Sequence, residues 1–307
     1  MTASTEPKGN DSTNDSGARS ITPLANGLYV PTVAFFTPED TIDVDTTSSH
    51  TKRLVEAGVA GLLTHGSNGE AVHLDHAERQ LINRITRSAL DASGKSDIPL
   101  IVGCGSQSTR ETIQLCVEAA ESGGTHALIL PPAYYGSLLT GDLIMEHFRA
   151  VADASPIPLL VYNFPAACSG LDLSSDTILA LAKHSNIVGV KLTCGNTGKL
   201  ARIVAGTKGT AFRTFGGSAD FTIQTLAVGG HGVIAGLGNV APRACTEIMR
   251  LWKEGKTDDA TLVQEIVARG DWAAIKGALS LEAQLAEFAE LIETEKQMAT
   301  ATSAASA

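Results

Sequence analysis

The chain has 307 residues, of which 43% are hydrophobic and 18% are charged, and its formal net charge at pH 7 is -10. This composition supports one sizeable buried core, and because no basic run occurs it argues against a nucleic-acid or anionic-membrane partner. Its five cysteines lie far apart without a CxxC pair, which is typical of reduced thiols, and no apolar run approaches the roughly 18 residues of a membrane span.

Residues 1–20 are rich in Ser, Thr, Asn, Asp and Gly and contain no hydrophobic segment, so we expect a disordered N-terminal tail. Acidic residues precede the first arginine, Arg19, whereas a mitochondrial presequence is rich in arginine and poor in acids. Residues 296–307 are a second, small-residue tail, and the chain between the tails, 21–295, is expected to fold as a single domain. Together with the reduced cysteines, these features predict a cytoplasmic location.

From residue 28 onward, short apolar runs alternate with amphipathic segments of helix length. The expected strands are 28–33, 61–65, 99–103, 127–130, 159–162, 187–191, 212–215 and 233–235. The expected helices are 45–56, 76–92, a segment from about 108, 142–153, 175–183, 197–205, a segment from about 219, 241–253, 258–270 and 272–294. In the third helix Ser108 and Glu111 have the spacing of a capping box.

Eight strands alternating with helices predict parallel strands joined by right-handed crossovers. At this length the simplest α/β architecture is a (β/α)8 TIM barrel with a C-terminal helical extension from about residue 241. A doubly wound open sheet is the alternative, but such a sheet usually has a glycine-rich phosphate loop after its first strand, and residues 31–35 (PTVAF) are not one. In a barrel, functional residues collect just after the carboxyl ends of the strands.

The sixth expected strand ends in Lys191 after an otherwise apolar run. Burial removes water from an ammonium group and lowers its pKa, and a neutral amine is a nucleophile toward carbonyl carbons. The alternative, which this strand by itself favours, is a lysine whose ammonium reaches solvent or pairs with a carboxylate. The residues at the other strand ends are therefore needed to choose between the two interpretations of Lys191.

Two loops after expected strands carry candidate groups. Residues 66–70 (GSNGE) form a glycine-framed turn after the second strand, where backbone amides and the Ser67 hydroxyl could hold a carboxylate. An ordinary glycine turn is the alternative. The fourth strand runs into Tyr134 and Tyr135, which suit chemistry at a strand end but also aromatic packing or a subunit contact.

The fifth expected strand ends in Tyr162, the start of the segment YNFP. Neighbouring strands lie about 5 Å apart, so Tyr162 is expected beside Lys191. A phenol there can relay the protons that an amine and a ketone exchange as they form an imine. With candidates on four strand ends directed at one cavity, the interpretation of Lys191 as a nucleophile becomes the better one.

Taken together, these motifs resemble the dihydrodipicolinate synthase / N-acetylneuraminate lyase superfamily of pyruvate-dependent class I aldolases, which fold as (β/α)8 barrels. The resemblance extends from about residue 26 to 295, and the glycine segments 216–218 and 236–242 are also similar to family segments. It implies a homotetramer, built as a dimer of dimers, that acts on a small 2-keto acid with no cofactor besides the lysine imine.

The resemblance also implies roles for individual residues. Lys191 would form the Schiff base and Tyr162 would relay protons. Ser67, Asn68 and Gly217 would bind the pyruvyl part of the substrate, and Tyr135 would enter the site of a neighbouring subunit.

One departure from the family pattern bears on the substrate. In dihydrodipicolinate synthases, which this chain resembles, an arginine soon after the YNFP-like motif binds the carboxylate of the incoming aldehyde. Residues 166–170 (AACSG) of this chain contain no basic side chain. Ser169 and Thr193 suit a polyol tail better. The motifs look closest to fungal L-threo-3-deoxy-hexulosonate aldolases, so we predict cleavage of a 2-keto-3-deoxy-hexonate to pyruvate and a glyceraldehyde. A 4-hydroxy-2-oxoglutarate aldolase is the alternative, and a dihydrodipicolinate synthase is less favoured.

Two other classes of function compete with this prediction. A metal-dependent aldolase would need clustered ligands, but the close histidine pair His73 and His76 has neither cysteine neighbours nor an HExxH arrangement, so no metal is expected. A sensor that binds 2-keto acids would not need an amine beside a phenol.

Overall fold

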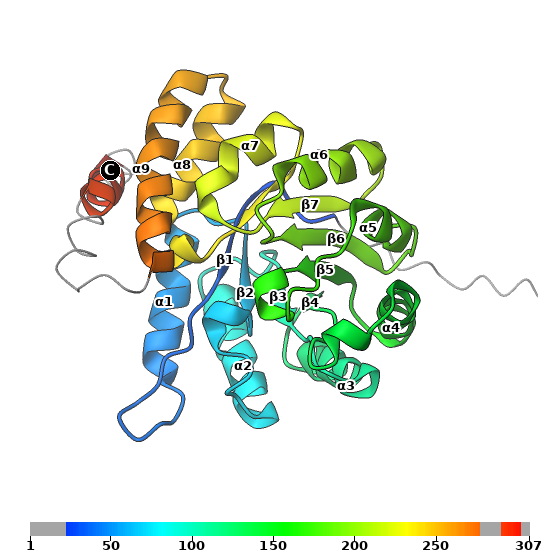
Figure 1. Ribbon diagram of the computed structural model, residues 1–307. Helices are drawn as coiled ribbons and strands as arrows, with labels where there is room; N and C mark the ends of the chain where they lie inside the picture. The colour runs from blue at the N-terminus through cyan, green and yellow to red at the C-terminus, as the bar shows by residue number, and fades with distance from the viewer. Residues whose placement is uncertain (1–22, 277–289, 302–307) are drawn as a thin grey trace, which may run out of the picture.

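The computed structural model describes residues 23–276 and 290–301. Within these residues eight strands close a barrel in chain order, with parallel pairing between all neighbours and between β8 and β1. Figure 1 shows the strands at the centre and the helices around them. The predicted (β/α)8 barrel is confirmed, and the open-sheet alternative is excluded because a closed sheet has no edge strands.

The eight strands lie within two residues of their predicted limits. Their bounds are β1 Gly27–Pro31, β2 Gly61–Thr64, β3 Leu100–Gly103, β4 His126–Ile129, β5 Leu159–Asn163, β6 Ile187–Leu192, β7 Arg213–Gly216 and β8 Gly232–Ile234. Strands β2, β3, β4 and β5 are buried at every position. Such strands appear in the sequence as continuous apolar runs because helices cover one face and the barrel interior the other.

Helices follow the strands in alternation. Their bounds are α1 Val44–Glu56, α2 His76–Ala92, α3 Thr109–Glu121, α4 Gly141–Ala154, α5 Ser175–Leu181, α6 Thr197–Gly206, α7 Thr222–Ala227, α8 Pro242–Lys253 and α9 Thr257–Lys276. Short 3-10 turns shape several loops at the carboxyl ends of strands: η1 Ser67–Gly69, η2 Gly136–Leu138, η3 Pro165–Ala167, η4 Ala219–Phe221 and η5 Gly236–Asn239. No helix in the described ranges is long and apolar enough to cross a membrane.

Some local predictions differ from the structure. Only half of the predicted capping box at α3 forms, because the Ser108 hydroxyl accepts the backbone N–H of Glu111 while the Glu111 carboxylate bonds to His76 instead. A complete capping box begins α2, between Asp75 and Glu78.

The predicted end of a helix at Gly270 is wrong, since α9 continues to Lys276. Residues 290–301 are also helical, so the tail expected from residue 296 starts inside a helix. The expected N-terminal tail 1–20 and the middle of the predicted helix 272–294 lie outside the described residues.

Side chains alternate between the barrel interior and the surrounding helices. On β5, Leu160 and Tyr162 belong to the interior cluster, whereas Leu159 and Val161 pack in the layer between strands and helices. This alternation directs the Tyr162 phenol into the barrel. It also directs the next residue, Asn163, outward, toward the helices.

Candidate functional site

Tyr162 and Lys191 lie side by side inside the barrel, at the carboxyl ends of β5 and β6. They are register partners, and Lys191 Nζ lies 4.3 Å from the centroid of the Tyr162 ring. Tyr162 is 4% exposed and Lys191 3% exposed. Within the described part of the chain, no carboxylate lies within ion-pair distance of Lys191 Nζ. Lysines are seldom buried in this way without a carboxylate, and such positions are candidates for a functional role.

A one-residue irregularity in β6 creates this pairing. The register of β5 and β6 shifts between Leu159, which aligns with Ile187, and Leu160, which aligns with Gly189. Without the shift, Lys191 would align with Asn163 instead of Tyr162. Bulges of this kind re-aim side chains next to functional sites.

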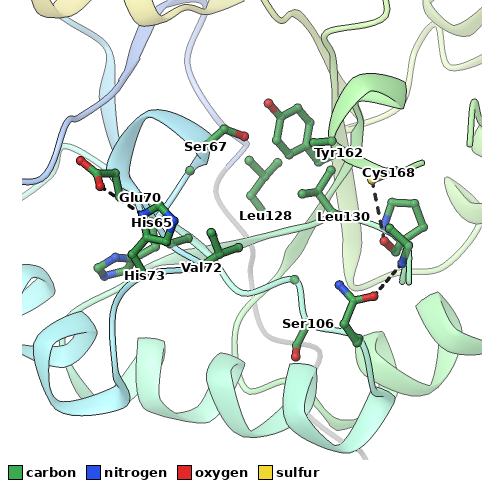
Figure 2. A pocket seen from close by; sticks show the side chains of 18 residues that line it. His65, Ser67, Glu70, Val72, His73, Ser106, Leu128, Leu130, Tyr162 and Cys168 are labelled. Carbon is green, nitrogen blue, oxygen red and sulfur yellow. Dashed lines mark hydrogen bonds and ion pairs between the residues drawn. The ribbon is translucent and has the colours of Figure 1, made fainter. Parts of the chain in front are cut away.

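The turn after β2 supplies Ser67 and Asn68, which are exposed at the mouth of the barrel. Figure 2 shows Ser67 and Tyr162 on the same side of a cavity, with their hydroxyl ends directed to the same region. Asn68 lies against the loop after β8, because a Cβ added to Gly236 would come within 2.8 Å of the Asn68 amide nitrogen. Glycine at 236 therefore allows the two loops to approach closely.

Thr193 and Gly217 meet just beyond β6 and β7. The Thr193 backbone N–H donates to the carbonyl of Asn163 (3.0 Å), and the Gly217 N–H donates to that of Leu192 (2.8 Å). A Cβ on Gly217 would lie 2.0 Å from Thr193 Oγ1, so only glycine fits there. The Thr193 hydroxyl is buried and has no hydrogen-bond partner among the described residues, which leaves it available to a ligand or water.

A cavity of about 300 Å³ opens beside Tyr162, at the ends of β2 to β5. Its lining is mostly apolar and contains no lysine or arginine. The lining residues are His65, Gly66, Ser67, Glu70, Ala71, Val72, His73, Gly103, Gly105, Ser106, Gln107, Leu128, Leu130, Pro131, Ala133, Tyr162, Ala167 and Cys168. Lys191 is not one of them, and its Nζ lies against the Tyr162 ring.

Burial sets the protonation of two groups on the cavity wall. It lowers the pKa of His65 to about 3, helped by nearby Arg79, so this imidazole is neutral. The His65 Nε2–H donates to the carbonyl of Arg79 at 2.8 Å. Burial raises the pKa of the Cys168 thiol to about 11, so it stays protonated. Neither side chain provides a charge for binding an anion.

Arg79 and Gln107 are structural supports of the site that the sequence did not reveal. The buried Arg79 guanidinium donates to the carbonyls of Ala71 (3.0 Å) and Gly103, which line the cavity. The side-chain oxygen of Gln107 accepts the N–H groups of Ala133 and Tyr134, both at 2.8 Å. Each is a polar residue on an amphipathic helix or loop, where the sequence pattern indicates only solvent exposure.

Only two of the eight predicted site residues, Ser67 and Tyr162, line this cavity. Ser169 has a left-handed backbone (φ 51°), and its hydroxyl donates to the carbonyl of Ala133 at 3.0 Å. Tyr135 is 64% exposed and packs edge-to-face against Tyr134, which is 79% exposed. The structure therefore groups Lys191, Tyr162, Ser67, Asn68, Thr193 and Gly217 at the barrel mouth, whereas the Ser169 hydroxyl is bonded to Ala133 and Tyr135 faces solvent.

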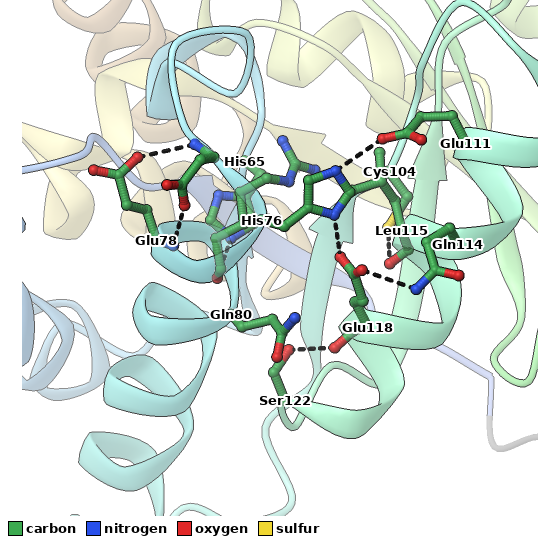
Figure 3. Close-up of polar contacts among 12 residues, drawn as sticks. His65, His76, Glu78, Gln80, Cys104, Glu111, Gln114, Leu115, Glu118 and Ser122 are labelled. Carbon is green, nitrogen blue, oxygen red and sulfur yellow. Dashed lines mark hydrogen bonds and ion pairs between the residues drawn. The ribbon is translucent and has the colours of Figure 1, made fainter.

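A polar cluster joins the helices beside the cavity (Figure 3). His76 Nε2 lies 2.9 Å from a Glu111 carboxylate oxygen, and His76 Nδ1 lies 2.7 Å from one of Glu118. The hydrogen bond with Glu118 is the largest of the effects that raise the pKa of His76. No group of three or more His, Cys, Asp or Glu side chains in the described ranges is arranged to hold a metal ion.

Comparison with known proteins agrees with this geometry. Residues 24–280 match the model of the dihydrodipicolinate synthetase family, and the chain belongs to this family. It is 60% identical over 255 residues to a protein of Emericella nidulans named "Probable 4-hydroxy-2-oxoglutarate aldolase, mitochondrial", covering 83% of this chain and 82% of that one.

A second relative, "L-threo-3-deoxy-hexylosonate aldolase" of Hypocrea jecorina, is 47% identical over 265 residues, which is 84% of each chain. Among solved structures, the Escherichia coli family member YagE, crystallised in complex with pyruvate, superposes with a TM-score of 0.77 at 29% identity over 88% of each chain. The predicted family is therefore confirmed.

Proposed function

We propose that this protein is a Schiff-base aldolase that reversibly cleaves a 2-keto-3-deoxy sugar acid, L-threo-3-deoxy-hexulosonate, to pyruvate and glyceraldehyde. The observation that carries the proposal is the buried pair of Lys191 and Tyr162, with Nζ 4.3 Å from the centroid of the phenol ring and no carboxylate partner in the described chain. The name of the Hypocrea jecorina relative and the pyruvate complex of YagE support the substrate class.

The reaction starts when the neutral Lys191 amine attacks the C2 ketone of the substrate. The amine gives up one proton, a second comes from solvent, and the ketone oxygen takes up both and leaves as water, so that a protonated imine forms. Tyr162, whose ring lies against the amine, relays these protons. The imine is the electron sink of the proposed reaction, which therefore uses no metal or organic cofactor.

Carbon–carbon cleavage follows on the imine. A base, Tyr162 acting through the substrate carboxylate or a water, removes the proton of the C4 hydroxyl. The electrons of the O–H bond form the aldehyde carbonyl, and those of the C3–C4 bond move into the imine to give an enamine. After glyceraldehyde leaves, C3 takes up a proton, and water hydrolyses the imine to release pyruvate and the free lysine.

Ser67 and Asn68 are proposed to bind the substrate carboxylate, with Thr193 and Gly217 completing the site. Support comes from the exposed position of the turn at the barrel mouth and from the buried Thr193 hydroxyl without a partner in the described chain. The role proposed for Ser169 in binding the polyol tail has weaker support, because its hydroxyl is bonded to Ala133.

A second candidate is a 4-hydroxy-2-oxoglutarate aldolase, which the name of the Emericella nidulans relative favours. Its substrate carries a second carboxylate, and its products are pyruvate and glyoxylate. We favour the sugar acid because no lysine or arginine lines the cavity, whereas carboxylate recognition commonly uses a guanidinium fork.

We also propose a homotetramer, built as a dimer of dimers, in which Tyr135 enters the site of a neighbouring subunit. The exposure of Tyr135 and its distance from the cavity of its own chain support this arrangement.

We also propose a cytoplasmic location. Imaging of the full chain with a C-terminal fluorescent tag tests it against the mitochondrial location in the name of the Emericella nidulans relative.

The experiment that tests the function combines trapping with turnover. Borohydride added with pyruvate reduces the imine, and intact-mass and peptide spectra should locate one pyruvyl adduct on Lys191. Pyruvate release is then measured with a panel of 2-keto-3-deoxy acids and with 4-hydroxy-2-oxoglutarate. Absence of an adduct would refute the Schiff-base mechanism, and turnover of only the five-carbon diacid would favour the second candidate.

A further inference from the structure

The described chain contains a second buried lysine close to the site. Lys199, on α6, is 4% exposed, much like Lys191 on β6. The two differ in their partners, because Lys199 Nζ forms an ion pair with Asp172 Oδ1, whereas Lys191 Nζ has no carboxylate partner in the described ranges. The Lys199 amine is therefore engaged as the cation of an ion pair and is not a second nucleophile.

Asp172 connects this cation to the strand that carries Tyr162. Its Oδ1 also accepts a hydrogen bond from Asn163 Nδ2 at 2.7 Å, and the side-chain oxygen of Asn163 accepts the N–H of Leu173 at 2.9 Å. Burial would raise the pKa of Asp172, but the hydrogen bonds from Lys199 and Asn163 outweigh burial and lower it. Both ends of the fully buried Asn163 amide are therefore fixed.

Asn163 in turn links the two strand ends that hold the reacting pair. It follows Tyr162 directly in β5, and its carbonyl accepts the N–H of Thr193, two residues after Lys191. Because side chains alternate along a strand, the outward Asn163 amide anchors β5 from the helix side while the Tyr162 phenol points inward.

The same contacts fasten both ends of the loop 164–171, since Asn163 and Asp172 flank it. Phe164 in this loop stacks on Tyr162, with ring centroids 5.7 Å apart and planes 24° apart. Cys168, from the same loop, lines the cavity. The position of the Tyr162 ring therefore depends on how this loop is held.

We propose that Asp172 and Lys199 are positioning residues that act through Asn163 and the loop 164–171 to hold the Tyr162 ring against the Lys191 amine. This inference rests on the proposed Schiff-base function and adds two residues to it. Neither side chain touches the substrate or the reacting atoms. Their contribution is to the rate of proton transfer, which is sensitive to small displacements of the phenol.

The test uses pyruvate alone, so that it does not depend on the identity of the aldehyde. Proton NMR in deuterium oxide measures exchange of the pyruvate methyl protons, which passes through the imine and enamine. Borohydride trapping counts the sites that form the imine. For Asp172→Asn and for the double variant Asp172→Asn/Lys199→Met, exchange per trapped site should fall by up to about 100-fold. Lys199→Arg keeps the cation and should stay near the parent rate.

Asp172→Asn alone leaves the buried Lys199 amine without its carboxylate and could prevent folding. The double variant replaces both charges with neutral groups, so the test can still be made. Asp153→Asn is the matched control. It removes the carboxylate that bonds to His184 at the C-terminal end of α4, and exchange per trapped site should not change.

The outcomes separate the two proposals. If the parent protein forms no adduct, the Schiff-base function fails and this inference fails with it. If the parent forms the adduct but the variants exchange at the parent rate per trapped site, only the positioning role is overturned. If Asp172 and Lys199 had a purely structural role, the substitutions would lower the melting temperature and the number of trapped sites but would not change the exchange rate per trapped site.

Discussion

At the scale of single residues, the proposed site combines a nucleophile with a proton relay in one buried position. The Lys191 amine and the Tyr162 ring are register partners on adjacent strands, and both are almost completely buried. Burial without a carboxylate partner is costly for a charged lysine, and such positions are used for chemistry more often than for stability. The first two predictions concern residues of this site.

Tyr162→Phe should lower kcat by about 10²–10⁴-fold, because the ring is kept and only the proton-relaying hydroxyl is lost. Steady-state pyruvate release measures the effect, and borohydride trapping should still yield an adduct on Lys191, formed more slowly. Tyr29→Phe is the control, since it removes a buried phenol hydroxyl whose one hydrogen bond among the described residues is to the carbonyl of Ala25. Equal activity of Tyr162→Phe and the parent protein would rule out the relay.

Gly217→Ala should destabilise the protein by about 1–3 kcal/mol, because the new Cβ would lie within 3 Å of Thr193 and Leu192 backbone atoms that cannot move aside easily. Urea unfolding measures the change. Gly141→Ala is the control, since no atom of a described residue outside its own helix lies within 4 Å of its Cβ position, and it should be neutral or stabilise by about 0.4–1 kcal/mol. Similar stability of the two variants would contradict the close packing at Gly217.

At the scale of secondary-structure elements, α2 and α3 are joined by His76, which bridges Glu111 and Glu118. Arg79, one helical turn further along α2, ties the end of β3 to the loop after β2. The position of α2 therefore affects the cavity wall that contains His65 and Gly103. Since the histidine pairs with both carboxylates only when protonated, this connection depends on pH.

Because the folded protein raises the pKa of His76 above its ordinary value of 6.5, the bridge contributes stability fully below pH 6.5. The contribution is lost as the pH rises through the raised, folded-state pKa. His76→Gln should therefore have a lower melting temperature than the parent protein at acidic pH, and the difference should shrink as the pH increases. A difference that stays constant across this range would show that protonation of His76 contributes nothing to stability.

The shifted register of β6 is a second feature at this scale. The run around Val188 is apolar apart from Gly189, and a glycine inside a strand is a common sign of a bulge, but the sequence does not say how such a bulge changes the pairing with β5. The irregularity becomes apparent only where β6 pairs with β5, and it determines that Lys191 faces Tyr162. The proposed chemistry therefore depends on a detail of strand pairing.

At the scale of the whole molecule, a pair of exposed tyrosines is the clearest candidate for a contact with another chain. Tyr134 and Tyr135 project from the loop after β4, and Leu138 and Leu143 nearby are also exposed. Large exposed apolar side chains grouped in this way favour an interface with another chain. The proposed tetramer would cover them and would bring Tyr135 to a neighbouring site.

Complementation between two inactive variants tests this arrangement. Tyr135→Phe and Lys191→Ala should each have low activity, and random mixing of their subunits should restore up to about a quarter of the parent activity, because half of the dimers are mixed and each of these has one complete site. Pyruvate release before and after subunit exchange measures the gain. No gain, with exchange verified by native mass spectrometry, would contradict a shared site.

The sequence determined much of the site because parallel strands follow simple rules. Apolar runs separated by helical segments predicted the barrel, and the barrel places every strand end on one face, which located Lys191, Tyr162 and Ser67 together. The same rules could not place Ser169 and Tyr135, whose positions depend on how loops pack. They also missed Arg79 and Gln107, since a buried polar side chain that bonds to backbone carbonyls or amides leaves no periodic signal.

The sequence by itself determined the fold class and the residues at the strand ends, because both follow from local alternation of apolar and polar side chains. Tertiary structure decided which of two similarly buried lysines has a carboxylate partner. Lys199 meets Asp172 across 27 residues of chain, while Lys191 meets the face of Tyr162. Pairing between distant segments, set by register and loop packing, decides where a charge is neutralised and where an amine has no counter-ion among the described residues.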